Sequence, residues 1–240
     1  MTMLDAGDLH LHYEIEGDGV PILLIAPGGM RSANNIWERM PWNPRTALVD
    51  SYRLIGMDQR NAGSSTAPVS RDDDWGTYAA DQLAFLDHLG IDRCHVLGMC
   101  IGGPYIAGLL RAAPQRFLSA VILQPVGIDA NRPSLEQMFD AWAEDLSADH
   151  PHMDAAAWQS FRSNMWDGEF LLAASLEDMA AVQTPMLVMM GDDIYHPEST
   201  SRELAAAAPN ARLIERWQDD DVLADTNEQI RSFLDEHSPT

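Results

Sequence analysis

The sequence contains no lysine, because all 15 of its basic residues are arginine. This absence excludes Schiff-base chemistry, lysine-anchored pyridoxal phosphate and a phosphate loop of the GxxxxGK type. Cysteine is also scarce, with only Cys94 and Cys100. They flank one expected strand, which would hold them about 20 Å apart at ~3.3 Å per residue, whereas a disulfide needs α-carbons within roughly 7 Å. We therefore expect two free thiols, as in a reducing compartment.

Positive charge and long apolar runs are also lacking. The 37 acidic and 15 basic residues give a net charge of −22, which would repel a nucleic-acid backbone or an anionic membrane surface. No stretch approaches the roughly 18 apolar residues of a membrane span, and the amino-terminal segment lacks the apolar run of a secretory signal. We expect a cytoplasmic protein with no nucleic-acid or membrane partner. The sequence leaves its oligomeric state open, with a homodimer as one alternative.

Strand-like and helix-like segments alternate along the chain. Several of the strand-like segments are continuous apolar runs, typical of strands buried on both faces of a parallel sheet. The expected strands are 9–15, 21–26, 53–57, 94–99, 119–124, 186–190 and 211–217. The expected helices are 78–89, with Thr77 as its N-cap, then 102–113, 199–208 and 226–237. The alternation predicts an α/β fold with a mostly parallel, twisted sheet, helices on both faces and right-handed crossovers.

Residues 127–184 interrupt this alternation. The segment has helical periodicity at 134–146 and 154–165 but no strong strand pattern. We expect a core domain formed by 1–126 and 185–240, with 127–184 as a short helical cap over a pocket. A packing layer without ligand contacts is the alternative. Three cap residues are candidates for lining a pocket that takes a small molecule with an apolar portion: Trp142, Trp158 and Trp166.

A tight Gly-Met-Cys-Ile-Gly turn, residues 98–102, joins an expected buried strand directly to an expected helix. Its glycines would let the strand and the helix approach closely while the residue between them adopts a strained backbone. The turn resembles the GxSxG nucleophile elbow of the α/β-hydrolase family, with Cys100 in place of serine. The amino terminus of the following helix would favour a thiolate there. The alternative is an unreactive cysteine buried in a glycine-rich turn.

The resemblance to the α/β-hydrolase family covers most of the chain. Residues 22–29, ILLIAPGG, resemble the family's strand and oxyanion loop. The resemblance implies an oxyanion hole formed by the backbone N–H of Gly29 or Met30 together with that of Ile101. Residues 58–65 resemble a family loop that we interpret as structural. The segment 184–197 resembles the one that carries the acidic member of the triad, and Asp193 is the matching residue, with Asp129 as a fallback.

The family's catalytic histidine is expected just after the last strand, but residues 217–234 contain no histidine. His196, three residues after Asp193, is a candidate replacement, because a thiol needs less activation than a serine hydroxyl. Alternatively, His196 only lines the pocket or hydrogen-bonds the backbone of its own loop. His10 and His12 share one face of an expected strand, which we expect to be exposed. No third metal ligand is evident beside them, and we expect neither a metal nor an organic cofactor.

These residues predict a hydrolase that acts on an ester, lactone, thioester or related acyl bond. Cys100 would attack the carbonyl carbon, and His196, oriented by Asp193, would transfer protons. Without a base to activate water, the acyl-enzyme would not turn over. The alternative is therefore a non-hydrolytic protein of the same fold, either a lyase or isomerase that uses the oxyanion hole or a ligand-binding protein.

Overall fold

The computed structural model describes residues 2–239, in which eight strands form one sheet in the order β1-β2-β4-β3-β5-β6-β7-β8. The strands are β1 (Thr2–Ala6), β2 (Leu9–Glu16), β3 (Val20–Ile25), β4 (Tyr52–Met57), β5 (Cys94–Met99), β6 (Phe117–Leu123), β7 (Met186–Met189) and β8 (Ala211–Ile214). β2 pairs antiparallel with β1 and β4, and all other pairs are parallel. All seven expected strands are present, and the α/β fold is confirmed. The sequence did not reveal β1.

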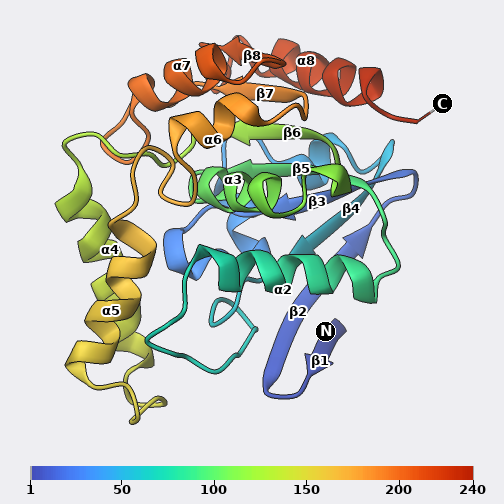
Figure 1. Cartoon of the computed structure of the whole chain (residues 1–240). Helices are drawn as coiled ribbons and strands as arrows, with labels where there is room; N and C mark the ends of the chain where they lie inside the picture. The colour runs from blue at the N-terminus through green and yellow to red at the C-terminus, as the bar shows by residue number, and fades with distance from the viewer. Residues whose placement is uncertain (1, 240) are drawn as a thin grey trace.

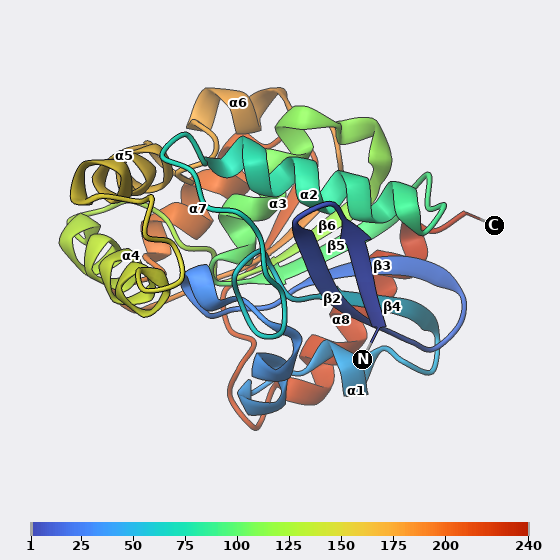
Figure 2. The same cartoon turned by 90° about the horizontal axis from the view of Figure 1, so that it is seen from below.

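Helices cover both faces of the sheet (Figures 1 and 2). One face carries α2 (Trp75–His88), α3 (Gly102–Ala112), α6 (Leu176–Ala181) and α7 (Glu198–Ala207); the other carries α1 (Pro44–Ala47) and α8 (Leu223–Glu236). Three short 3-10 helices are η1 (Gly29–Arg31), η2 (Asn34–Arg39) and η3 (Pro114–Arg116). A hydrophobic core lies on each face, and Cys100 packs against both. Within residues 2–239, no helix has the length and hydropathy that crossing a membrane requires.

Helix α2 begins three residues earlier than the sequence indicated. Its N-cap is Asp74, whose side chain accepts a hydrogen bond of 3.0 Å from the backbone N–H of Thr77. The Thr77 hydroxyl in turn accepts from the backbone N–H of Asp74, completing a capping box. The prediction of Thr77 as N-cap was therefore wrong. Thr77 is the third residue of the helix, and its side chain bonds the backbone of the N-cap residue Asp74,.

The two helices expected within 127–184 are α4 (Arg132–Leu146) and α5 (Ala155–Trp166). They pack on each other beyond one edge of the sheet (Figures 1 and 2). A cluster of aromatic side chains packs between them, mostly edge to face: Phe139, Trp142, Trp158 and Phe161. α6, which the sequence did not reveal, contacts α3 and α7 of the core. The division into core and cap stays a prediction.

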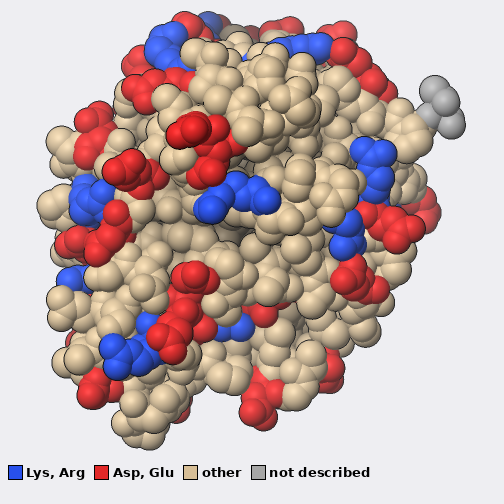
Figure 3. All heavy atoms as spheres, viewed as in Figure 1, with Lys and Arg blue, Asp and Glu red and all other residues tan. Residues whose placement is uncertain are grey.

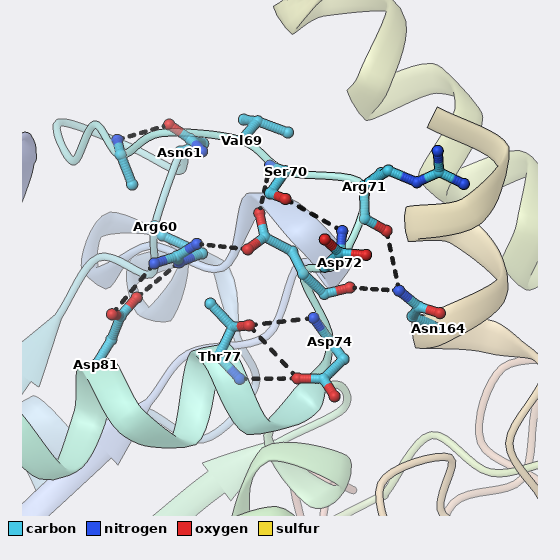
Figure 4. A network of polar contacts seen from close by, with 12 residues as sticks. Arg60, Asn61, Val69, Ser70, Arg71, Asp72, Asp74, Thr77, Asp81 and Asn164 are labelled. Atoms are coloured by element: carbon cyan, nitrogen blue, oxygen red, sulfur yellow. Dashed lines mark hydrogen bonds and ion pairs between the residues drawn. The ribbon is translucent and has the colours of Figure 1, made fainter. Parts of the chain in front are cut away.

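A buried polar network holds the loop before α2 in place and ties it to α5 (Figure 4). Arg60 donates to Asp81 at 2.7 Å and to Asp73 at 3.2 Å. At the far end, the side-chain amide of Asn164 in α5 donates to the carbonyl oxygens of Arg71 at 3.0 Å and Asp73 at 3.2 Å. The loop 58–65 therefore contributes internal structure, as its sequence indicated, and the network positions α5 over the core.

Candidate active site

Cys100 stands at the apex of the turn between β5 and α3. Its φ of 61° lies in the left-handed region, which costs a residue with a side chain of the order of 1–3 kcal/mol. A Cβ on Gly98 would lie 3.0 Å from the Cα of Gly102, so glycine is needed where the strand and helix meet. The backbone of Cys100 is held at both ends, since its N–H donates to Leu123 O and its carbonyl accepts from Val126 N–H, each at 3.0 Å. The turn therefore combines a left-handed residue at its apex with a close approach of strand and helix.

Asp193 and His196 lie in the loop that follows β7. One carboxylate oxygen of Asp193 accepts from the backbone N–H of Tyr195 at 2.8 Å and that of His196 at 3.1 Å. The other lies 2.8 Å from the imidazole Nδ1 of His196. His196 is buried, whereas the Asp193 side chain is half-exposed. Asp193 thereby fixes both the loop backbone and the orientation of the ring.

The imidazole of His196 couples electrostatically to the thiol of Cys100. Burial alone would raise the pKa of Cys100, but the neighbouring His196 imidazole lowers it below its usual value. Burial alone would likewise lower the pKa of His196, but Cys100 and then Asp193 raise it to about 9. Nε2 of His196 is buried and has no well-aligned hydrogen-bond partner in residues 2–239.

The loop after β3 brings backbone N–H groups to the same thiol. The backbone N–H groups of Gly28 and Ile101 also act to lower the pKa of Cys100. Gly28 has a φ of 119°, in the left-handed region that favours glycine,. The sequence did not indicate Gly28 as a donor to the thiol, and its neighbours Gly29 and Met30 were the predicted oxyanion-hole donors. Gly29 and Met30 begin η1, and the first N–H groups of a helix have no acceptor within it,. The side chain of Met138 in α4 lies directly against Gly29.

The position after β8, where the family's histidine was expected, is filled by Trp217. This indole is only 1% exposed and donates from Nε1 to the carbonyl oxygen of Met190 at 2.8 Å. The carbonyl oxygen of Trp217 accepts from the hydroxyl of Thr226 in α8, also at 2.8 Å. The loop after β8 is thus anchored to the end of β7 by an indole.

The three cap tryptophans contact other side chains of the cap and core. Trp142 is almost wholly buried, and its Nε1 donates to the carbonyl oxygen of Asn61 at 3.1 Å. Trp166 is fully buried and packs edge-on against Trp75. Trp158 lines a groove of about 430 Å³ formed by α4, α5 and the residues around them. Trp142 and Trp166 are therefore part of the packed interior, and the role of the three tryptophans in binding substrate stays a prediction.

A groove of about 430 Å³ lies beside Asp193. We call it the acid groove, because four carboxylates line it: Asp129, Asp192, Asp193 and Glu198. Its lining contains no arginine among the described residues. Figure 3 shows acidic side chains spread widely over one face of the molecule, in keeping with the net charge of −22. An anionic molecule approaching the groove would be repelled.

The remaining candidates lie apart from this arrangement. His12 is 8% exposed, and its Nδ1 lies 3.0 Å from a carboxylate oxygen of Asp58, so the expectation of an exposed face was wrong for this residue. Its neighbour on that face, His10, bonds Asp5. Asp129 is exposed, and its Oδ1 accepts the backbone N–H of Ala130. Within residues 2–239, no three His, Cys, Asp or Glu side chains are grouped to hold a metal ion.

Known proteins are similar to this chain in sequence and in fold. Residues 21–236 match the model of a family described as alpha/beta hydrolase fold. "Putative carbamate hydrolase RutD" of Stutzerimonas stutzeri is 28% identical over 234 residues, covering 85% of this chain and 86% of that protein. Carboxylesterase YbfK of Bacillus subtilis is 23% identical over 213 residues, covering 79% of this chain and 70% of that protein. The crystal structure of an enol-lactonase from Burkholderia xenovorans superposes with a TM-score of 0.73 at 21% identity, covering 98% of this chain and all of that one (100%). The chain therefore belongs to the α/β-hydrolase fold family.

Proposed function

We propose that this protein hydrolyses an ester, lactone, thioester or related acyl bond through a covalent intermediate on Cys100. The observation that carries the proposal is the pairing of His196, held by Asp193 at 2.8 Å, with the thiol at the elbow. Family membership and two relatives that are named as a carbamate hydrolase and a carboxylesterase support hydrolase activity. The cysteine mechanism rests on the geometry and electrostatics of this chain.

The first half-reaction forms a thioester. The Cys100 thiolate attacks the carbonyl carbon, and a C–S bond forms while the carbonyl oxygen becomes an oxyanion. The N–H of Ile101 and an N–H of the loop at Gly28 and Gly29 would donate to that oxyanion. When the intermediate collapses, the bond to the leaving group breaks, and that group takes the proton from Nε2 of His196.

The second half-reaction releases the acid. His196, now neutral, takes a proton from water as the water oxygen attacks the thioester carbon. Collapse of the second oxyanion breaks the C–S bond and returns Cys100 as a thiolate beside the imidazolium. Ester and water have become acid and alcohol, with no other reactant. The half-exposed Asp193 keeps Nδ1 protonated throughout, so that Nε2 is the atom that exchanges the proton,.

We propose a substrate with an apolar acyl or alcohol portion. The apolar side chain of Met138 lies against Gly29 in the oxyanion loop. Gly29 follows Gly28, whose backbone amide acts on the Cys100 thiol, so an apolar group is present close to the site. The acid groove beside Asp193 disfavours a carboxylate at that side,. Trp142, Trp158 and Trp166 are further candidates for apolar contact if the cap moves.

Turnover of p-nitrophenyl acetate tests the mechanism. We expect Cys100→Ala and His196→Ala to lose at least about 10²-fold in kcat/KM. Cys94→Ala is the matched control, since Cys94 is a buried thiol at the opposite end of β5 whose pKa burial raises to about 12. It should keep its activity. A Cys100→Ala variant as active as the parent would contradict the covalent mechanism.

A further inference from the structure

We propose that Asn131 is a positioning residue that sets the place of His196 relative to Cys100. The inference rests on the proposed function of that pair. Asn131 is 3% exposed, and its side-chain amide donates to the carbonyl oxygens of Gly127 at 2.9 Å and Ile194 at 2.8 Å. Ile194 lies between Asp193 and His196 in the same loop. A buried side chain therefore binds the backbone of the loop that carries the base.

The segment that ends at Asn131 also contacts the elbow. It leaves β6 at Gln124, and the N–H of Val126 donates to the carbonyl oxygen of Cys100 at 3.0 Å. A Cβ on Gly127 would clash with the side chain of Thr200 in α7, so this segment packs closely against the helix that follows the histidine loop. Residues 124–131 thus bridge the backbone of the nucleophile and the backbone of the base.

The histidine loop has little else to hold it at Ile194. The side chain of Ile194 is 60% exposed and that of Tyr195 is 39% exposed, so neither residue buries enough apolar surface to anchor the loop,. At Ile194 itself, the hydrogen bond from Asn131 joins the backbone to the segment after β6, beside the turn that Asp193 holds. When it is lost, the loop and the imidazole can move away from the thiol.

The chemistry of the amide explains why asparagine is needed. Both hydrogens of Nδ2 go to carbonyl oxygens, while Oδ1 accepts the backbone N–H of Asp129 at 3.0 Å. A carboxylate of the same shape has no hydrogen to donate and would place oxygen against two oxygens. Asn131 is the N-cap residue of α4, but its side chain bonds none of the helix amides, so substitution removes no capping hydrogen bond.

The test is the pH dependence of Cys100 alkylation by iodoacetamide, followed by intact mass from pH 5 to 10. The variants are Asn131→Asp, Asn131→Ala and the milder Asn131→Ser, whose hydroxyl can donate to one carbonyl. Asn164 offers a matched control, because its amide also donates to two carbonyl oxygens but lies in α5 (Figure 4). Circular dichroism at the assay temperature selects the variants that fold.

We expect the Asn131 variants to move the alkylation midpoint upward, toward that of His196→Ala, with Asn131→Ser moved least. At a pH well below the midpoint, the thiolate fraction falls about tenfold when the midpoint rises by one on the pH scale. Asn164→Asp and Asn164→Ala should keep the parent profile. If the midpoint rises in His196→Ala but stays unchanged in every folded Asn131 variant, the positioning role is overturned while the proposed function stands. If His196→Ala itself leaves the midpoint unchanged, the Cys100–His196 pair is what fails.

Discussion

Removal of the His196 imidazole should change how Cys100 ionises, and the size of the change follows from the groups around the thiol. Burial raises the pKa of Cys100, while His196 and the N–H groups of Gly28 and Ile101 lower it. In His196→Ala, only the two N–H groups oppose burial. We expect the pKa of the Cys100 thiol to rise, and each rise of one on the pH scale leaves about tenfold less thiolate at a pH well below that pKa.

The rate of alkylation at a single pH understates this change. When the thiol pKa rises by one, the thiolate becomes about threefold more nucleophilic, which offsets part of its tenfold lower abundance. The rate at pH 7 should therefore fall only about threefold for each tenfold loss of thiolate. The midpoint of the pH profile reports the pKa directly, because nucleophilicity changes the plateau and not the midpoint.

The assay is alkylation by iodoacetamide across pH 5 to 10, with thiolate absorbance at 240 nm as an independent signal. His196→Gln separates charge from volume, because it fills much of the same space without a cation. His152→Ala is the control, since its Nε2 bonds the carbonyl oxygen of Val69 beside the cap. If Cys100 has the same alkylation midpoint in His196→Ala and His196→Gln as in the parent protein, this reasoning is refuted.

Three further predictions concern proton transfer, packing and charge. The rate of acylation by an ester with a poor leaving group should fall above about pH 9. The pKa of His196 is raised to about 9, so above that pH the imidazole loses the proton that the leaving group needs. A rate that stays constant to pH 10 would contradict this prediction. Gly191→Ala should lower stability by about 1–3 kcal/mol in a thermal melt and weaken activity, because its methyl group would collide with His196; unchanged melting and kcat/KM would oppose it. A carboxylate-bearing ester should have a lower kcat/KM than its neutral analogue at low salt, and 1 M salt should narrow the gap, since the Debye length falls to about 3 Å; a gap independent of salt would argue against repulsion by the acid groove.

Most of the sheet could be predicted from the sequence because its central parallel strands, such as β5 and β7, are buried on both faces. β5 has every residue buried and matched its predicted range of 94–99. β1 has five residues, of which three are exposed, and depends on its pairing with β2, so it has no strong pattern of its own. The burial of His12 was hidden for a related reason, because its partner Asp58 is 46 positions away.

The candidate site divides in the same way between local and distant contacts. The glycines around Cys100 indicate its strained turn, and Asp193 reaches His196 within three residues, so both features can be read from short segments. Asn131 contacts a carbonyl oxygen 63 positions away, and nothing around it in the sequence marks that contact. Trp217 is a similar case, since its indole bonds the end of another strand.

The most direct test of the covalent mechanism is intact mass spectrometry after the protein is mixed with an activated acyl ester. We expect a transient acyl adduct on the parent protein, no adduct on Cys100→Ala, and a persistent adduct on His196→Ala, because the acyl-enzyme then lacks its base for attack by water. An adduct that survives in Cys100→Ala, or product formation with no adduct at any pH while Cys100 stays unreactive to iodoacetamide, would contradict the account.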